Sequence, residues 1–361
     1  MERDPVPAEL HELKLRDYRP RSMLRAPVHE VPRARFPAVD AHDHLGRWLT
    51  PDWSAPDVGA LIDLMDACNV ETIVNLDGRL PDELDANLAR YDRAHPGRFL
   101  TFAQADWRVT ADDGFGTALA AQLRGAVDRG ARGMKVWKTL GLHLRDPQGA
   151  LLMPGDARLT PLWEAAAEAD FPILIHVADP VAFFEPLDAR NERLEELLAH
   201  PDWFFGDRSR FPTFDAIIDS FESLIAQNPQ TTFIGAHVGC VAEDLAWVDR
   251  MLSSYPNFHA DIAARIPELG RQPRAARQLL TAHPDRILFG TDEFPPTRET
   301  YTTHFRFLET ADEHFAYGGD EDALPTQGRW SISGLELPDD VLRAVYGDNA
   351  RRLLHLPGPS R

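Results

Sequence analysis

The sequence predicts a (β/α)8 TIM barrel of the α/β class, built as a single domain with long loops over one end. Three observations support this prediction. Eight short apolar runs alternate with longer amphipathic stretches from Phe36 onward. Histidine or aspartate ends four of these runs, and the strand ends of a barrel converge on one rim. The chain has 361 residues, a length that barrels routinely use as one unit.

The eight apolar runs are short and uninterrupted, as expected for parallel strands buried on both faces. They are Ala38–Ala41, Thr72–Leu76, Phe99–Gln104, Gly133–Trp137, Ile173–Ile175, Thr232–Ala236, Phe258–Ile262 and Ile287–Phe289. Helical periodicity marks the stretches between them, which are Val58–Cys68, Leu84–His95, Thr117–Arg129, Leu162–Ala169, Phe214–Gln227, Ala242–Tyr255 and Ala275–Ala282. An open dinucleotide-binding sheet is the alternative fold, but no G-x-G-x-x-G follows the first strand.

The segments outside the alternating strands and helices are an N-terminal arm and two long connections. Residues 1–36 hold several prolines and predict an extended arm with a short helix near Glu9–Leu15, whereas residues 37–356 form the barrel. Two connections are longer than is needed to join a barrel strand to the next helix: residues 179–213 after strand five and residues 293–337 after strand eight. Long connections after barrel strands lie over the carboxyl end of the barrel, so we expect both to act as lids. Pro338 and Asp339 begin a last amphipathic helix, Asp339–Leu354.

Composition excludes several classes of protein. The net charge of −19 disfavours a nucleic-acid partner or an anionic membrane surface. No uninterrupted apolar stretch reaches the ~18 residues of a membrane-spanning helix, and the N-terminal residues lack the apolar core of a secretory signal. Cys68 and Cys240 are too few and too distant for a disulfide framework. We therefore expect a cytoplasmic protein with a small-molecule substrate, and a homodimer is an open option.

Polar side chains end four predicted strands: His42 and His44 follow strand one, His176 strand five, His237 strand six and Asp292 strand eight. His42 and His44 are two residues apart, so on a strand they share a face. Two imidazoles joined by a third and by a carboxylate suit Zn²⁺ or another borderline divalent ion. We therefore predict one bound divalent ion, Zn²⁺ first, with Mn²⁺ and Fe²⁺ as alternatives. A histidine that merely packs or caps a strand end explains any one of these positions, but not all of them together.

These motifs resemble the amidohydrolase superfamily over about residues 37–356. The matching strings are Val39-Asp40-Ala41-His42-Asp43-His44, His176, Ala236-His237-Val238-Gly239, Gly290-Thr291-Asp292, and a closing helix with Leu337-Pro338-Asp339-Asp340-Val341-Leu342 and Asn349-Ala350-Arg351-Arg352-Leu353-Leu354. They are most similar to the amidohydrolase-related branch that includes aminocarboxymuconate semialdehyde decarboxylase. The resemblance implies one metal held by His42, His44, His176 and Asp292. It also implies that His237 acts as an acid/base beside the metal, a role that suits a neutral imidazole.

Further residues near these strand ends are candidates with open roles. Asp40 and Asp43 either orient imidazoles or are simply polar residues at a strand end. Lys135 in strand four has three interpretations: an anchor for an anionic substrate, a lysine at the barrel rim, or a carboxylated bridge between two metals, as in some members of the superfamily. Lys138 lies on the opposite face of that strand, so only one of the two points inward. Substrate contact or loop packing is expected for the remaining candidates, Arg47, Trp48 and Arg265.

The predicted activity is hydrolysis of a small amide, lactone or ester. Metal-bound water would lose a proton to Asp292 or His237, and the hydroxide would attack a polarised carbonyl. The alternative is non-oxidative decarboxylation of an unsaturated or aromatic acid, which uses the same metal ligands. A barrel that binds without catalysis is a third hypothesis, but every expected ligand is in place. The ligand set cannot separate the first two, because the substrate pocket decides between them.

Overall fold

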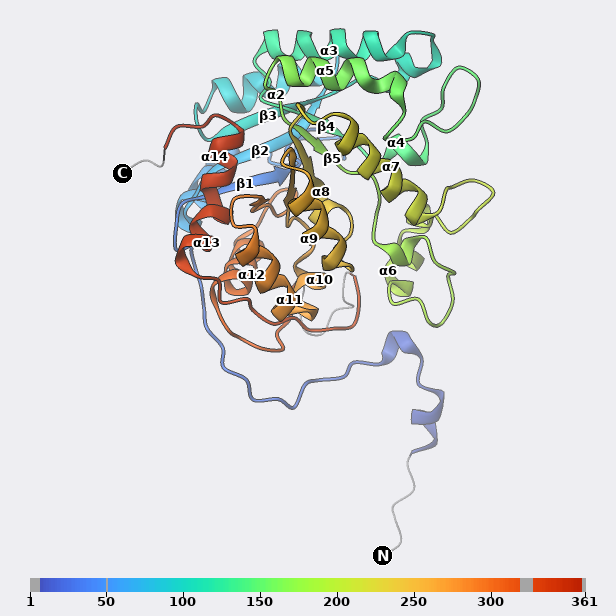
Figure 1. Ribbon diagram of the computed structural model, residues 1–361. Helices are drawn as coiled ribbons and strands as arrows, with labels where there is room; N and C mark the ends of the chain where they lie inside the picture. Colours follow the sequence, from blue (N-terminus) through green and yellow to red (C-terminus); the bar gives the residue numbers. More distant parts are fainter. Residues whose placement is uncertain (1–6, 50, 319–326, 359–361) are drawn as a thin grey trace, which may run out of the picture.

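The apolar runs form eight parallel strands, which pair in sequence order in a single sheet. The computed structural model describes residues 7–49, 51–318 and 327–358 (Figure 1). The strands are β1 (Ala38–Asp43), β2 (Val70–Arg79), β3 (Phe99–Gln104), β4 (Met134–Val136), β5 (Ile173–Ile175), β6 (Phe233–Gly235), β7 (Phe258–Asp261) and β8 (Ile287–Leu288). Ala41 N–H donates to Phe289 O, and Asp292 N–H donates to His42 O, which brings the first and last strands together. The predicted (β/α)8 barrel is therefore confirmed.

Helices follow the strands and cover the outside of the sheet (Figure 1). They are α1 (Val58–Cys68), α2 (Glu83–Asn87), α3 (Phe115–Arg129), α4 (Thr139–Leu142), α5 (Thr160–Glu168), α6 (Leu194–Ala199), α7 (Phe214–Gln227), α8 (Ala236–Gly239), α9 (Leu245–Ser254), α10 (Ile266–Arg271), α11 (Pro273–Ala282), α12 (Arg298–Glu309), α13 (Asp339–Arg343) and α14 (Asn349–Leu353). Two predicted helices contain π-helical stretches: Leu88–Arg93 follows α2, and Ala344–Asp348 joins α13 to α14.

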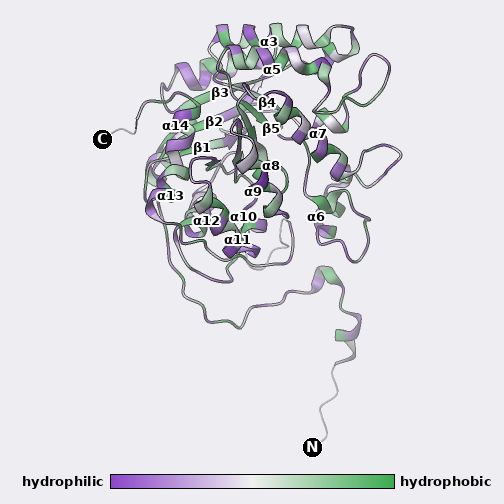
Figure 2. Cartoon of the chain, in the orientation of Figure 1, coloured by the Kyte–Doolittle hydropathy of each residue, from purple (hydrophilic) through white to green (hydrophobic). Residues whose placement is uncertain are grey.

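The barrel interior is filled by alternate residues of the strands. Val39 and Ala41 of β1 pack with Leu100 and Phe102 of β3, and Leu354 of the closing helix belongs to the same cluster. A larger apolar cluster lies between the sheet and the helices. Figure 2 shows the resulting pattern, with largely hydrophobic central strands and helices that carry hydrophobic and hydrophilic residues side by side. The polar side chains at the strand ends do not belong to these apolar clusters and are available to form a site.

The two long connections are more structured than the sequence analysis expected. The 293–337 connection contains the twelve-residue helix α12, which Thr297 begins with a capping box and which buries Tyr301, Phe305 and Leu308. The 179–213 connection contains α6, and its buried Arg193 pairs with Glu268 of α10. Of the 293–337 connection, residues 319–326 lie outside the described residues. The predicted role of both connections as lids stays a prediction.

The N-terminal arm is an extended chain (Figure 1), and Arg329 donates to Leu15 O and Tyr18 O in it. The expected helix near Glu9–Leu15 is two short 3-10 turns, Ala8–Glu12 and Leu15–Asp17, while residues 1–6 lie outside the described part. His29 anchors the arm through Asp312, with 2.5 Å between Nδ1 and Oδ1. No helix of the described chain is both long and apolar enough to cross a membrane.

One buried carboxyl beside β3 makes stability depend on pH. Burial raises the pKa of Asp92 to about 6, although Thr101 donates to its carboxylate through N–H and Oγ1. Because this folded pKa lies above the unfolded value of about 3.9, the carboxyl contributes stability that is present below pH ~4 and lost as pH rises through ~6. An Asp92→Asn side chain can accept from the Thr101 N–H and donate to its Oγ1 at every pH.

We therefore expect Asp92→Asn to gain about 1–2 kcal/mol in unfolding free energy, relative to wild type, between pH 4 and pH 7. Urea unfolding at several pH values measures this difference. Asp128→Asn is the matched control, because Asp128 is exposed near the end of α3. A wild-type-minus-variant difference that stays flat over this range would show that Asp92 does not titrate as described.

Candidate active site and metal centre

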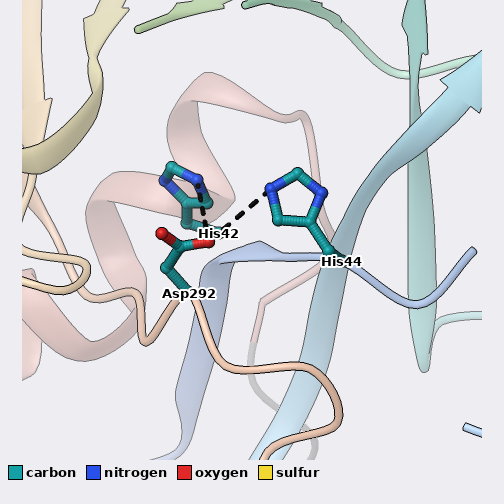
Figure 3. Close-up of side chains that lie close together, drawn as sticks. All are labelled: His42, His44 and Asp292. Carbon is teal, nitrogen blue, oxygen red and sulfur yellow. Dashed lines mark ion pairs between the residues drawn. The ribbon is translucent and has the colours of Figure 1, made fainter. Parts of the chain in front are cut away.

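The site is centred on two histidines at the end of β1 and one aspartate after β8. His42 Nε2 and His44 Nε2 each lie 3.6 Å from Asp292 Oδ1 (Figure 3). Both histidines are fully buried, while the Asp292 side chain is 21% exposed. The register of β1 against β2 shifts between Asp40 and Asp43, where these side chains leave the regular sheet. Ligand atoms of all three residues lie within 4.8 Å of one another, close enough to hold one metal ion.

Two further aspartates fix the orientation of the imidazole rings. Asp261 Oδ2 accepts from His42 Nδ1 at 2.8 Å, and Asp77 Oδ1 accepts from His44 Nδ1 at 2.6 Å. Each bond places the proton on Nδ1 and leaves the Nε2 atom, 3.6 Å from Asp292 Oδ1, without a proton. The His44 Nε2 is buried and has no hydrogen-bond partner among the described residues. An unpartnered buried nitrogen, beside a second imidazole and a carboxylate, fits a divalent metal.

His237 lies beside this cluster on the turn that follows β6. Its Nε2 is 3.8 Å from Asp292 Oδ2, and its Nδ1 lies 2.9 Å from Ala263 O. The backbone of His237 has φ +59°, and Val238 follows with φ +60°. A left-handed conformation is costly for residues with a β-carbon, so its presence at two successive positions marks a locally strained turn. That turn directs the free imidazole nitrogen at Asp292.

His176 is close to the cluster but faces another way. Its ring centroid lies 4.5 Å from that of His237. Its Nε2 lies 3.1 Å from Ala178 O and 3.4 Å from Asp179 Oδ1, while its Nδ1 is buried without a described partner. The structure therefore brings His42, His44, His237 and Asp292 together and places His176 at their edge. Its predicted role as a metal ligand stays a prediction.

Burial keeps three of these imidazoles uncharged. Desolvation, followed by the charge of Lys135, lowers the pKa of His42 well below its usual value. Desolvation and then His176 lower the pKa of His237 in the same way, and desolvation lowers the pKa of His176 to about 4. A metal binds imidazole in its neutral form, and a neutral imidazole can accept a proton. The burial of the site thus favours both functions.

Lys135 of β4 is the cation of this site. Its side chain is fully buried, and its Nζ lies 3.1 Å from His42 Nε2. Desolvation lowers the pKa of Lys135 to about 8, although Asp292 opposes this shift. Lys138, which lies beyond the end of β4 and directly before α4, instead pairs with Asp179, with 2.5 Å between Nζ and Oδ2. Of the two lysines, Lys135 is therefore the one beside the histidine cluster.

A cavity of about 1120 Å³ opens beside Lys135 at the carboxyl ends of β1 to β4. Trp48 and Trp137 line it, with their rings edge to face and 4.2 Å between centroids. Trp48 thus lies in the wall of this cavity, and its predicted contact with substrate stays a prediction. Arg47 does not line this cavity but pairs with Glu83, which does. Arg265 is buried outside it and donates to Ala264 O.

The aspartates that hold the rings were missed by the sequence analysis, which weighed Asp40 and Asp43 instead. Neither of those accepts a bond from an imidazole ring: Asp40 accepts from Thr291 N–H and Oγ1, and Asp43 accepts from His44 N–H. A signal for Asp77 and Asp261 was present, because Asp77 directly follows predicted strand two and Asp261 lies near the end of predicted strand seven. Both therefore obey the strand-end rule that identified the histidines.

Comparison with known proteins agrees with this geometry. A family model described as amidohydrolase matches residues 51–356. No curated protein matches the sequence. The structure of 2,6-dihydroxybenzoate decarboxylase from Rhizobium superposes with a TM-score of 0.56 at 19% identity, over 90% of this chain and 100% of that one. 5-Carboxyvanillate decarboxylase from Sphingomonas paucimobilis gives 0.52 at 14% identity, over 89% and 99% of the two chains.

A third structure is similar to the same extent. Dihydroxybenzoic acid decarboxylase from Polaromonas, with bound manganese and the inhibitor 2-nitroresorcinol, superposes with a TM-score of 0.54 at 18% identity, over 89% of this chain and 97% of that one. At such identities the likeness shows the fold. The barrel and the residues at its strand ends define a (β/α)8-barrel enzyme. With its family model matched over most of its length, the chain belongs to the amidohydrolase family.

Proposed function

We propose that this enzyme is a metal-dependent, non-oxidative decarboxylase of an aromatic or unsaturated carboxylic acid. The observation that carries the proposal is Lys135, a fully buried cation beside the histidine cluster and in the wall of the cavity. A decarboxylase must hold a carboxylate close to its metal. Trp48 and Trp137 add an aromatic wall for a planar substrate beside that cation. The solved structures with which this fold superposes include decarboxylases of aromatic acids.

The metal would be held by His42, His44 and Asp292, with His176 as a fourth ligand if its ring turns. This donor set of imidazoles and a carboxylate suits Zn²⁺ and also suits Mn²⁺, which is bound in the Polaromonas decarboxylase. When bound, the ion would act as a Lewis acid on a substrate oxygen. Asp77 and Asp261 would keep the two imidazoles in the tautomer that binds it.

The side chains of the site have different roles in the proposed reaction. Lys135 holds the carboxylate of the substrate by its charge. Asp292 and His237, with 3.8 Å between Oδ2 and Nε2, share the proton that is needed at carbon. They deliver it to the carbon that carries the carboxylate, the bond between that carbon and the carboxylate breaks, and its electron pair returns to the unsaturated system as CO₂ leaves. Trp48 and Trp137 limit the access of water to that carbon.

Hydrolysis, which the sequence analysis placed first, needs the same ligands and the same acid/base pair. The difference lies in Lys135, because a neutral amide, lactone or ester gives a buried cation nothing to pair with. A carboxylate substrate gives it a partner and so offsets the cost of its desolvation. For this reason we now place decarboxylation ahead of hydrolysis.

Isotope incorporation distinguishes decarboxylation from hydrolysis. The Mn²⁺-loaded and Zn²⁺-loaded enzymes are incubated with a panel of hydroxybenzoic acids, unsaturated acids, lactones and cyclic amides in D₂O enriched in ¹⁸O. We expect CO₂ release from an acid, one deuterium at the vacated carbon, and no ¹⁸O in the other product. Incorporation of ¹⁸O into a product carboxylate from a lactone or amide, without CO₂, would establish hydrolysis instead. His237→Asn is the control that measures the rate without the imidazole partner of Asp292.

A further inference from the structure

The N-terminal arm (Figure 1) holds a basic and apolar segment in solvent. Residues 18–28 contain three arginines and no acidic residue, in a chain of net charge −19. The side chains of Met23, Leu24 and Val28 in this segment are 90%, 67% and 72% exposed, whereas Val31, three residues further along, packs against the core. Seven of the eleven exposed large hydrophobic side chains of the described chain lie on the arm, so its exposed apolar surface is concentrated there.

Both ends of this segment are fixed, so it is not a loose tail. Arg329 donates to Tyr18 O, and the N–H of His29 donates to Asp312 Oδ2 at 2.8 Å. Between these two anchors, no backbone group of residues 19–28 hydrogen-bonds to the barrel in the described part of the chain. The arm therefore presents apolar side chains and backbone hydrogen-bonding groups outward in a defined extended conformation, as a peptide does when it binds a second protein surface.

A surface of complementary character lies next to the arm. Arg329 also donates to Glu195 of α6, through Nε at 2.6 Å and through Nη2 at 2.9 Å, and so joins the arm to this helix. Residues 185–198, which include most of α6, contain five acidic and two basic residues. Two leucines of this segment are exposed, Leu187 at 39% and Leu198 at 63%. This surface is thus apolar and acidic where the arm is apolar and basic.

The two surfaces lie side by side on one molecule, which makes a second copy of this chain the partner that fits best. In a two-fold pair, the same patch of each copy faces the other, so a basic half beside an acidic half can pair twice. A polyanionic partner would be repelled by the net charge of −19. Pro20 and Pro27 prevent residues 18–28 from forming the continuous amphipathic helix that lies on a membrane surface.

We propose that this protein pairs with a second copy through its arm, with residues 18–28 of one copy packed against residues 185–198 of the other. The apolar side chains supply the buried area, and an ion pair between Arg25 and Glu185 fixes the register. Both of these residues are exposed, and neither forms an ion pair in the described part of the chain. The arm segment lies outside residues 51–356, which the family model matches, so the contact is a feature of this chain beyond the barrel of its family.

Sedimentation velocity of the full-length protein over a range of concentrations tests this inference independently of any activity. We expect a dimer for wild type. Leu24→Asp should raise its dissociation constant at least about 10-fold, because each dimer loses two buried apolar contacts. Arg25→Glu and Glu185→Arg should each weaken the dimer, because each places two like charges opposite one another. The double variant Arg25→Glu/Glu185→Arg restores opposite charges and should recover most of the loss.

Arg124→Glu is the matched control, because it makes the same change of charge on an exposed face of α3. It should leave the dimer unchanged, and circular dichroism checks that every variant is folded. The inference is overturned if wild type is a monomer at all concentrations, if Leu24→Asp leaves the dimer intact, or if the charge exchange recovers nothing. Binding of a monomeric wild type to vesicles of phosphatidylserine and phosphatidylcholine, lost in Leu24→Asp, would overturn it in favour of a membrane partner.

Discussion

Replacing His44 by alanine is expected to abolish metal binding and to reduce activity to background. The His44 Nε2 is buried without a partner and lies 3.6 Å from Asp292 Oδ1, so its loss removes a nitrogen from the centre of the cluster. Loss of an outer hydrogen-bond partner of a metal ligand typically costs about 10- to 100-fold in affinity. We therefore expect a loss of more than about 100-fold for the ligand itself. Elemental analysis after dialysis, with titration of Mn²⁺ and Zn²⁺, measures this loss.

The matched control is His143→Ala, because His143 lines the cavity beside Lys135 but lies outside the histidine–aspartate cluster. It should retain one metal per chain. His42→Ala is expected to behave like His44→Ala, since each variant leaves one carboxylate oxygen, of Asp261 or of Asp77, without its imidazole partner. One equivalent of metal retained by His44→Ala would refute the assignment, as would a wild-type protein that takes up neither ion.

Replacing His237 by asparagine is expected to leave metal content near wild type and to lower the rate by about 10²–10⁴-fold, the range for a general acid or base. Asparagine is chosen for two reasons. It tolerates the left-handed backbone that His237 adopts, at φ +59°. Its side-chain amide can also replace the bond from Nδ1 to Ala263 O. What the variant loses is the nitrogen that faces Asp292.

Metal content distinguishes the two roles that His237 can have. His42, His237 and Asp261 also form a group whose ligand atoms lie within 4.8 Å of one another. If His237→Asn loses its metal together with its activity, His237 is a ligand and our assignment as an acid/base is wrong. If it keeps both metal and rate, the proton is carried by Asp292 alone. Only a full metal complement with a reduced rate agrees with the proposed role.

The fold could be predicted from the sequence because each strand has a local signature, a short run of apolar residues. A parallel strand that is buried on both faces is largely apolar, so all eight strands overlap a predicted run; Phe99–Gln104 and Ile173–Ile175 have the predicted bounds, and the bounds of the other six differ. Helix α12 was not found, although its capping box at Thr297 is a local signal. It lies within the 293–337 connection, which the sequence analysis predicted to be a lid.

The residues of the candidate site could be predicted for the same reason, because a polar residue at the end of an apolar run can be recognised from the sequence alone. That His42, His44, His237 and Asp292 meet follows from barrel topology, which brings every carboxyl strand end to one rim. The sequence by itself therefore determined the barrel, the family resemblance and the inventory of polar groups at its rim.

Only the tertiary structure decided how these groups are oriented and paired. Asp77 and Asp261 hold the rings, Lys135 rather than Lys138 lies beside the cluster, and His176 faces Ala178 O. The contacts of His42 and His44 with Asp261, Asp77 and Lys135 join segments that are far apart in the sequence, whereas the orientation of His176 depends on the rotamer that the packing selects. Charge and periodicity along a chain are local properties, whereas the partner of a buried nitrogen is set by whichever distant segment the closed barrel brings within about 3 Å.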